Sequence, residues 1–292
     1  MTAPGTTLVE VGGSPVRARV SGPADGEPLL LVHGIGRSLE DWQAAHDRLA
    51  VTHRAVSIDL PGFGLTRRGG ERAGLASFAR AVVGVLDALG EQRPVHLMGN
   101  SLGGAVAMTT SVDFPDRVAS LTLVNSAGFG RTAHVSVLPM LYGALSAAPV
   151  VGPWFRPLAR NAGIQVNRRL FFDEAMATEQ MIRHAATVAR QPDFRATFTA
   201  TALSLGLPLL GSYPQWRRTL LARVARAALP TLIVWGDADR VLPPAQFHAA
   251  VAALPHARSH LFADTGHMPQ IERTEQFSDL AADFVRTAAQ RT

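Results

Sequence analysis

The run from Val95 to Gly104 constrains this chain more than any other stretch. Apolar residues 95–98 predict a short strand, and helix-forming residues 105–108 follow a Gly-Asn-Ser-Leu-Gly turn at 99–103. A serine at the apex of such a turn sits in strained backbone, and the glycines leave room where side chains would collide with strand and helix. The pattern predicts a nucleophilic Ser101, with the amide of Leu102 facing developing negative charge. The competing interpretation is a glycine-rich turn that only packs a helix on a sheet.

Predicted strands and helices alternate on both sides of this turn. Residues 7–11 and 16–20 alternate in polarity around a turn and predict a hairpin. Continuous apolar runs, typical of strands buried on both faces, lie at 29–32, 55–58, 121–124 and 231–235, and a further strand is predicted at 259–262. Helical spacing is found at 39–49, 75–89, 244–253 and 276–289. The alternation predicts an α/β fold with a mainly parallel sheet and helices on both faces.

The middle of the chain has a different pattern. Residues 129–226 contain no convincing strand and are rich in Ala, Leu and Arg, with helical stretches near 137–145, 173–190 and 195–205. An all-helical insertion within an α/β pattern suggests a lid over a site. We therefore expect a core formed by residues 1–128 and 227–292, and an inserted helical cap at 129–226.

The composition is that of a globular protein, with 47% hydrophobic and 17% charged residues in 292. The absence of cysteine excludes disulfide and thiolate chemistry. The first residues lack the basic and apolar regions of a secretory signal, and the longest apolar stretch, 135–151, is broken by proline and glycine. The expectation is a cytoplasmic protein without stable membrane insertion.

All 28 basic residues are arginine, and the net charge is +5. Residues 131–225 hold 11 Arg and four acidic residues, whereas the remainder holds 17 Arg and 19 acidic residues. The excess is therefore local, and it does not indicate nucleic-acid binding. This local positive charge has two interpretations: the arginines lie on solvated helix faces, or they attract an anionic substrate or surface.

A serine nucleophile needs a base, and the base needs an orienting acid. His267 follows the last predicted strand in a glycine-flexed loop, at the sheet edge where open α/β folds bind ligands. Asp239 and Asp237 both follow the strand at 231–235, and we favour Asp239 because Asp237 beside a glycine suits a turn. Asp59 also ends a strand, but the Leu-Pro-Gly after it indicates a structural turn.

The second oxyanion donor is expected in the loop after the strand at 29–32, and the amide of Ile35 is the preferred candidate, acting together with that of Leu102. The order Ser, Asp, His along the chain is the one known for α/β-hydrolases. Such a site needs neither a metal nor an organic cofactor.

These motifs together resemble a serine α/β-hydrolase with a lid, over nearly the whole chain. The resemblance rests on His33-Gly34, residues 59–64 and 99–104, residues 236–239 with Pro243, and Gly266-His267. The resemblance supports Asp239 as the acid, since the family's acid follows the glycine by three positions. A serine nucleophile argues against the dehalogenase and epoxide-hydrolase branches, which attack with a carboxylate.

The branch within the family is less defined. Gly-Asn-Ser-Leu-Gly-Gly and residues 190–194 resemble the meta-cleavage-product hydrolases, which split carbon–carbon bonds in vinylogous diketones. That resemblance implies that Arg190 contacts a substrate carboxylate. Against it, Met268 stands where that group places tryptophan after the catalytic histidine. Simple carboxylesterases share most of the same features.

The sequence thus predicts a carboxylesterase-type serine hydrolase acting on a small-molecule ester or related acyl compound. The alternatives are a carbon–carbon bond hydrolase and a non-hydrolytic ligand-binding or biosynthetic protein of the same fold. Homodimerisation is left open. The expected substrate contacts are Gly34, Asn100, Arg190 and Met268.

Overall fold

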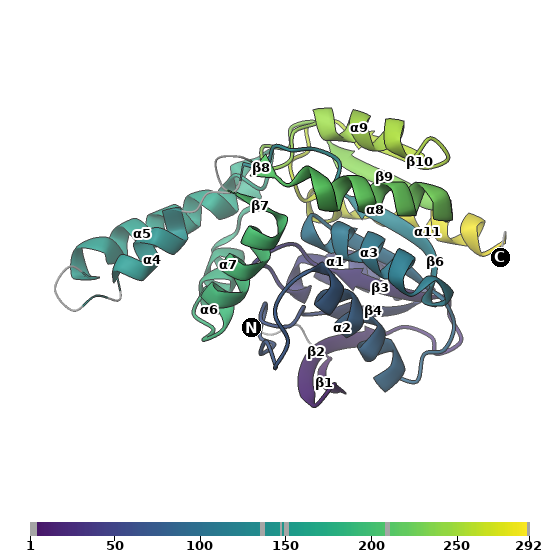
Figure 1. Cartoon of the computed structure of the whole chain (residues 1–292), viewed down its shortest axis with the longest axis horizontal. Coiled ribbons are helices and arrows are strands. Elements are labelled where there is room, and N and C mark those ends of the chain that lie inside the picture. Colours follow the sequence, from purple (N-terminus) through teal and green to yellow (C-terminus); the bar gives the residue numbers. More distant parts are fainter. Residues whose placement is uncertain (1–4, 135–137, 147, 149–151, 208–210, 291–292) are drawn as a thin grey trace.

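A computed structural model describes residues 5–134, 138–146, 148, 152–207 and 211–290. Within them, eight strands form one sheet in the order β1-β2-β4-β3-β5-β6-β9-β10 (Figure 1). The pairs β1–β2 and β2–β4 are antiparallel, and the other neighbours are parallel, which confirms the predicted α/β fold. The strands are β1 (Thr6–Val11), β2 (Ser14–Ser21), β3 (Pro28–Val32), β4 (Arg54–Ile58), β5 (Val95–Asn100), β6 (Val118–Val124), β9 (Thr231–Gly236) and β10 (Arg258–Phe262).

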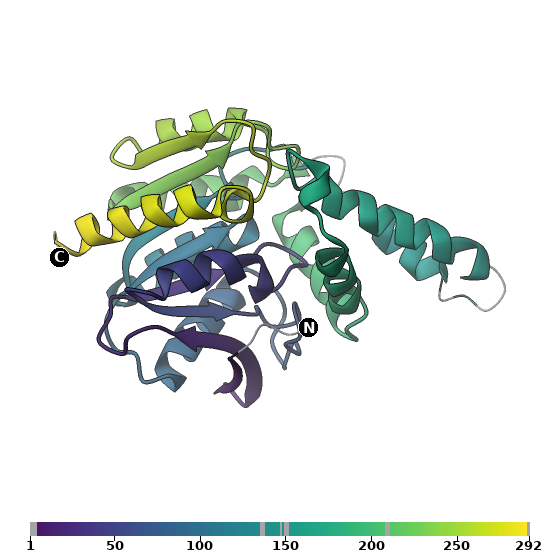
Figure 2. The same cartoon turned by 180° about the vertical axis from the view of Figure 1, so that it is seen from behind.

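Helices cover both faces of this sheet. Helices α1 (Gln43–Leu49) and α11 (Thr274–Ala289) share one face, which Figure 2 shows with α11 in yellow. The other face carries α2 (Leu75–Ala88), α3 (Leu102–Asp113), α8 (Pro214–Ala227) and α9 (Ala245–Ala253). Strand β3 is apolar throughout because both of its faces are buried. Leu29 and Leu31 pack in the cluster beneath α1 and α11, whereas Leu30 and Val32 pack in the cluster on the opposite face.

Four helices inserted between β6 and β9 lie outside the sheet (Figure 1), and we call them the cap helices. They are α4 (Leu138–Ser146), α5 (Gly152–Arg168), α6 (Glu179–Ala189) and α7 (Phe194–Leu205). Two-residue strands β7 (Gly206–Leu207) and β8 (Gly211–Ser212) follow and pair with each other. The remaining short helix is α10 (Pro269–Glu272), and 3-10 turns lie at Leu39–Trp42, Pro115–Arg117 and Glu174–Met176.

The inserted segment differs from the sequence-based expectation in several elements. The helix expected at 173–190 begins only at Glu179, because a separate 3-10 turn occupies Glu174–Met176. Helix α5 was not predicted because it contains Pro157, but it forms and packs along α4. Helix α8 was not predicted either; Pro214 starts it, and it packs on α3 rather than among the cap helices. The β7–β8 pair is too short to leave a periodic signal. Val137, the first residue of one predicted helix, lies outside the described residues.

No helix in the described ranges is long and apolar enough to cross a membrane.

Candidate active site

Ser101 occupies the sharp turn between β5 and α3, with φ 56° and ψ −116°. This left-handed conformation is strained for a residue with a side chain. A Cβ atom on Gly99 would lie 2.1 Å from the carbonyl oxygen of Gly103, and one on Gly103 would lie 2.2 Å from that of Val32. Only glycine therefore lets strand, turn and helix approach closely enough to hold the serine in this conformation.

His267 and Asp239 form a buried pair at the same edge of the sheet. Nδ1 of His267 lies 2.8 Å from Oδ2 of Asp239. The amides of Val241 and Leu242 donate to the other carboxylate oxygen at 2.7 and 3.0 Å. These donors orient the carboxylate, and the carboxylate fixes the imidazole with its proton on Nδ1, which leaves Nε2 as an acceptor.

Two asparagines connect the loops that carry these three residues. Asn100, next to Ser101, donates from Nδ2 to the carbonyl oxygen of His267 at 3.1 Å. Asn125, at the end of β6, donates to Oδ2 of Asp239 at 2.6 Å and to the carbonyl of Gly266 at 3.3 Å. The segments that contain the predicted nucleophile, acid and base therefore meet at the carboxyl ends of β5, β9 and β10.

The loop after β3 lies against the serine. A Cβ atom on Gly34 would be 3.3 Å from Cβ of Ser101. The amide of Ile35 donates to no acceptor among the described residues. The amide of Leu102 is the first in α3 and has no acceptor within the helix. Both amides are thus free to serve a ligand, as an oxyanion hole requires.

His33 holds this loop in position. The amide of Leu60 donates to its Nε2 at 3.0 Å, so its proton is on Nδ1, which lies 2.7 Å from the carbonyl oxygen of Gly34. Burial lowers the pKa of His33 and keeps the ring neutral. The histidine is therefore a structural support of the loop, and a neutral one.

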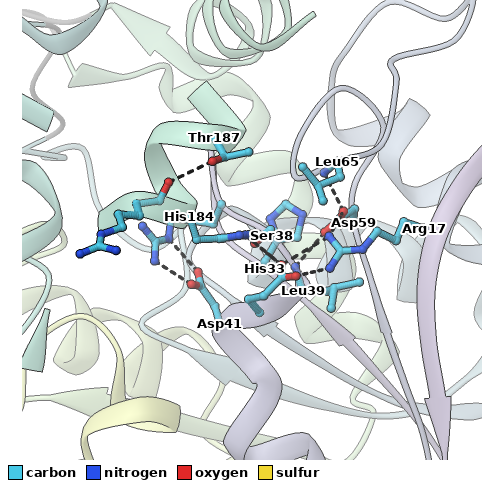
Figure 3. A network of polar contacts seen from close by, with 12 residues as sticks. Arg17, His33, Ser38, Leu39, Asp41, Asp59, Leu65, His184 and Thr187 are labelled. Atoms are coloured by element: carbon cyan, nitrogen blue, oxygen red, sulfur yellow. Dashed lines mark hydrogen bonds and ion pairs between the residues drawn. The ribbon is translucent and has the colours of Figure 1, made fainter. Parts of the chain in front are cut away.

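A polar network behind the loop joins it to the cap (Figure 3). Nε2 of His184, from α6, lies 2.8 Å from Oγ of Ser38 and 3.0 Å from Oε2 of Glu40. Burial would raise the pKa of Glu40, but hydrogen bonds from His184, Arg17 and Ser38 outweigh it and hold that pKa well below its usual range. Glu40 is thus a carboxylate that ties a cap helix to the core.

Asp59 belongs to the same network. Its carboxylate accepts from Arg17 at 2.9 Å and from the amides of Leu39 and Leu65, each at 2.8 Å. These contacts fix the turn after β4 against the turn after β3. Asp59 is therefore a structural carboxylate, in agreement with the turn that its sequence context indicates.

The cap also touches the histidine loop. The amide of His267 donates to the carbonyl of Leu170 at 2.7 Å. Met268 is buried and packs with Leu170 and Phe171, so it contributes to the contact between cap and core. On the other side of the site, a Cβ atom on Gly36 would lie 3.2 Å from the ring of Phe198 in α7.

The remaining predicted residues have different environments. Asp237 is exposed and only its Oδ1 atom contacts an amide, that of Thr265 at 3.4 Å, whereas Asp239 is buried beside the histidine. Arg190 lies exposed at the end of α6. Asn100 supports the histidine loop, and its Oδ1 is buried without a hydrogen-bond partner. Substrate contact by Gly34, Asn100, Arg190 or Met268 stays a prediction.

Two supporting residues were not identified from the sequence. Asn125 directly follows a buried strand, a position that could have marked it as part of the site. Glu272 gave no such signal, yet its carboxylate accepts from the amides of Gly266 at 2.9 Å and Met268 at 3.3 Å. It holds the histidine loop from the side of α10.

The described residues include no group of three or more His, Cys, Asp or Glu side chains arranged to hold a metal ion.

A model of the alpha/beta hydrolase fold family matches residues 27–274. The dihydrolipoyllysine-residue acetyltransferase component of the acetoin cleaving system of Pseudomonas putida is 32% identical over 283 residues, covering 97% of this chain and 70% of that protein. The 2-hydroxy-6-oxo-6-phenylhexa-2,4-dienoate hydrolase of Comamonas testosteroni is 29% identical over 269 residues, covering 90% and 88%.

Among solved structures, a serine hydrolase from the polyaromatic hydrocarbon-degrading bacterium Cycloclasticus zankles superposes with a TM-score of 0.78. It is 20% identical, and the match covers 96% of this chain and 97% of that one. The similarity covers the cap helices as well as the sheet, and at this sequence identity it shows a shared fold only.

Proposed function

The chain belongs to the alpha/beta hydrolase family, and we propose that it is a serine hydrolase that cleaves a carboxylic ester or a related acyl compound. The observation that carries the proposal is the buried bond between His267 and Asp239, at the sheet edge where Ser101 sits in strained backbone. A base oriented by an acid beside a serine at the apex of a sharp turn is the arrangement that activates a hydroxyl.

In the proposed reaction, Ser101 attacks the carbonyl carbon while Nε2 of His267 takes the hydroxyl proton. The amides of Ile35 and Leu102 stabilise the oxyanion, and Asp239 stabilises the imidazolium. His267 returns the proton to the leaving alcohol, which gives an acyl-enzyme on Ser101. Water activated by the same imidazole then releases the acid. The cap helices would cover the substrate during these steps.

A second candidate is hydrolysis of a carbon–carbon bond by the same three residues. The relative from Comamonas testosteroni is named as a dienoate hydrolase, and Arg190, which directly follows the cap helix α6, is exposed. In this candidate Arg190 would bind the substrate carboxylate. The two candidates differ in the bond that is cleaved and in the need for that cation.

A substrate panel tests both. Nitrophenyl esters of increasing acyl length and a ring-fission dienoate are assayed with the wild-type protein, and Ser101→Ala sets the background. We expect the esters to be turned over with higher kcat/KM than the dienoate, and Arg190→Gln to leave ester hydrolysis unchanged. Preference for the dienoate, with a raised KM in Arg190→Gln, would replace the esterase proposal by the second candidate. No turnover of either class would contradict both.

A further inference from the structure

Helices α4 and α5 form a hairpin that stands clear of the sheet in both views (Figures 1 and 2). The rings of Tyr142 in α4 and Phe155 in α5 are 6.2 Å apart and lie between the two helices. This contact defines the inner side of the hairpin.

Several large apolar side chains of this hairpin are exposed to solvent. Trp154 is 80% exposed, more than any other large hydrophobic residue of the described chain, and Leu158 is 45% exposed. Residues four apart share one side of a helix, so these two form one apolar strip on α5. Leu141 in α4 is 52% exposed. Isolated exposed leucines are ordinary, but an exposed tryptophan within an apolar strip marks a contact surface.

The charged residues of the same hairpin are all basic, and they lie on α5 and at its end. No Asp or Glu occurs between Arg131 and Phe172. Arg156 and Arg160 on α5, and Arg168 and Arg169 at its end, are all exposed. No carboxylate in the described part of the chain forms an ion pair with these four arginines. Elsewhere arginines are commonly paired, as Arg17 is with Asp59.

The two kinds of side chain are segregated on α5. Arg156 and Arg160 are four apart, and they are offset by two residues from Trp154 and Leu158, which places them on the opposite side of the helix. A basic side opposite an apolar side that contains tryptophan is the pattern of a helix lying in a membrane interface. Long arginine side chains can extend from that side to lipid phosphates.

We propose that the α4–α5 hairpin docks on an anionic lipid bilayer. Trp154 and Leu158 enter the boundary between headgroups and acyl chains, and the arginines bind lipid phosphates. The uniform positive charge favours this occupant over a second copy of the hairpin, because two such surfaces repel each other. The inference is independent of the proposed hydrolase activity, and an inactive protein would still dock.

Vesicle co-sedimentation of the full chain tests the proposal. Vesicles of phosphatidylcholine alone are compared with vesicles that also contain phosphatidylserine, at low and high salt. We expect binding only to the anionic vesicles, and weaker binding at high salt because surface charges are screened. Each arginine removed in Arg156→Gln and Arg160→Gln is expected to reduce the partition coefficient about fivefold.

Matched control variants distinguish an effect of the hairpin from a general effect of removing an exposed arginine or an exposed apolar side chain. Arg72→Gln removes an exposed arginine outside the hairpin, and Leu8→Ala removes an exposed leucine of β1; neither should change binding. Trp154→Ala should reduce the partition coefficient at least about tenfold. Tryptophan fluorescence should shift to the blue on vesicle binding, and Trp154→Phe should abolish that shift while the buried Trp42 and Trp235 and the half-buried Trp216 remain.

Four results would overturn the proposal. They are absence of binding to anionic vesicles, equal binding to both vesicle types, equal losses in the hairpin and control variants, and a protein dimer that Trp154→Ala dissociates. The last would show that a second copy covers the strip. Ester hydrolysis and thermal unfolding of each variant, measured in the absence of lipid, confirm that the protein is folded.

Discussion

The Nδ1 atom of His267 lies 2.8 Å from the Oδ2 atom of Asp239, and both side chains are buried. Asp239→Asn removes the charge and the acceptor that fixes the imidazole tautomer, while keeping the shape. We expect kcat to fall by about 10³–10⁴-fold. Asp237→Asn is the matched control, because that carboxylate follows the same strand but is exposed. Similar kinetic losses in the two variants would contradict the assignment of Asp239.

Gly34 controls how closely the early loop approaches Ser101, the proposed nucleophile. In Gly34→Ala the new methyl group would lie 3.3 Å from Cβ of Ser101 and 3.4 Å from Oδ1 of Asn100. This crowding moves the loop, so its amide no longer meets the developing oxyanion. We expect kcat to fall at least about tenfold with little change in thermal stability. Gly74→Ala, where the added atom meets nothing within 4 Å, should leave kcat unchanged.

Gly103 allows α3 to approach strand β3 closely. An added Cβ atom would lie 2.2 Å from the carbonyl oxygen of Val32 in the neighbouring strand. Backbone of a central strand cannot move aside cheaply, so Gly103→Ala should lower the free energy of unfolding by at least about 2 kcal/mol. Denaturant titration measures this loss. Gly163→Ala, in open space on α5, should instead be neutral or stabilising by up to about 1 kcal/mol.

Protonation linked to His46 should lower the stability of the protein in mild acid. His46 lies between Ser21 and Ser57, with ring nitrogens 2.5 and 2.6 Å from their hydroxyl oxygens. Burial, helped by the charge of Arg19, lowers its pKa to about 4. Between that value and the unfolded pKa of about 6.5, the unfolded chain binds more protons. The free energy of unfolding should therefore fall as the pH drops through this window.

The expected contribution of His46 is on the order of 3 kcal/mol, and it levels off below about pH 4. His96, whose pKa burial also lowers to about 4, adds to the same decline. Denaturant titrations at several pH values should show a shallower decline in His46→Gln than in the wild-type protein. His248→Gln changes an exposed histidine and should reproduce the wild-type slope. An unchanged slope in His46→Gln would refute this account.

The sequence was most informative where the structure depends on local pattern. The apolar runs of β3 to β6 and the turn at Ser101 are short-range signals, so the sheet and the position of the serine could be predicted. The loops of Asp239 and His267 follow strands, and parallel strands end at a common edge. Their proximity therefore followed once the fold class was known.

Contacts between distant segments could not be predicted in the same way. The bond between Ser38 and His184 joins residues 146 positions apart, and nothing local to either residue indicates it. Glu272 supports the histidine loop only because α10 turns back over that loop. Helix α5 forms despite Pro157 because packing along α4 outweighs its weak intrinsic propensity.

The central claim is that Ser101 becomes acylated during turnover, and covalent labelling tests it most directly. The protein is treated with an alkyl fluorophosphonate, and the labelled peptide is identified by mass spectrometry. We predict one adduct, on Ser101, formed by the wild-type protein and by Ser111→Ala, which alters another buried serine at the far end of α3. Ser101→Ala should form none. Undiminished labelling of Ser101→Ala, or an adduct at another residue of the wild-type protein, would contradict the account.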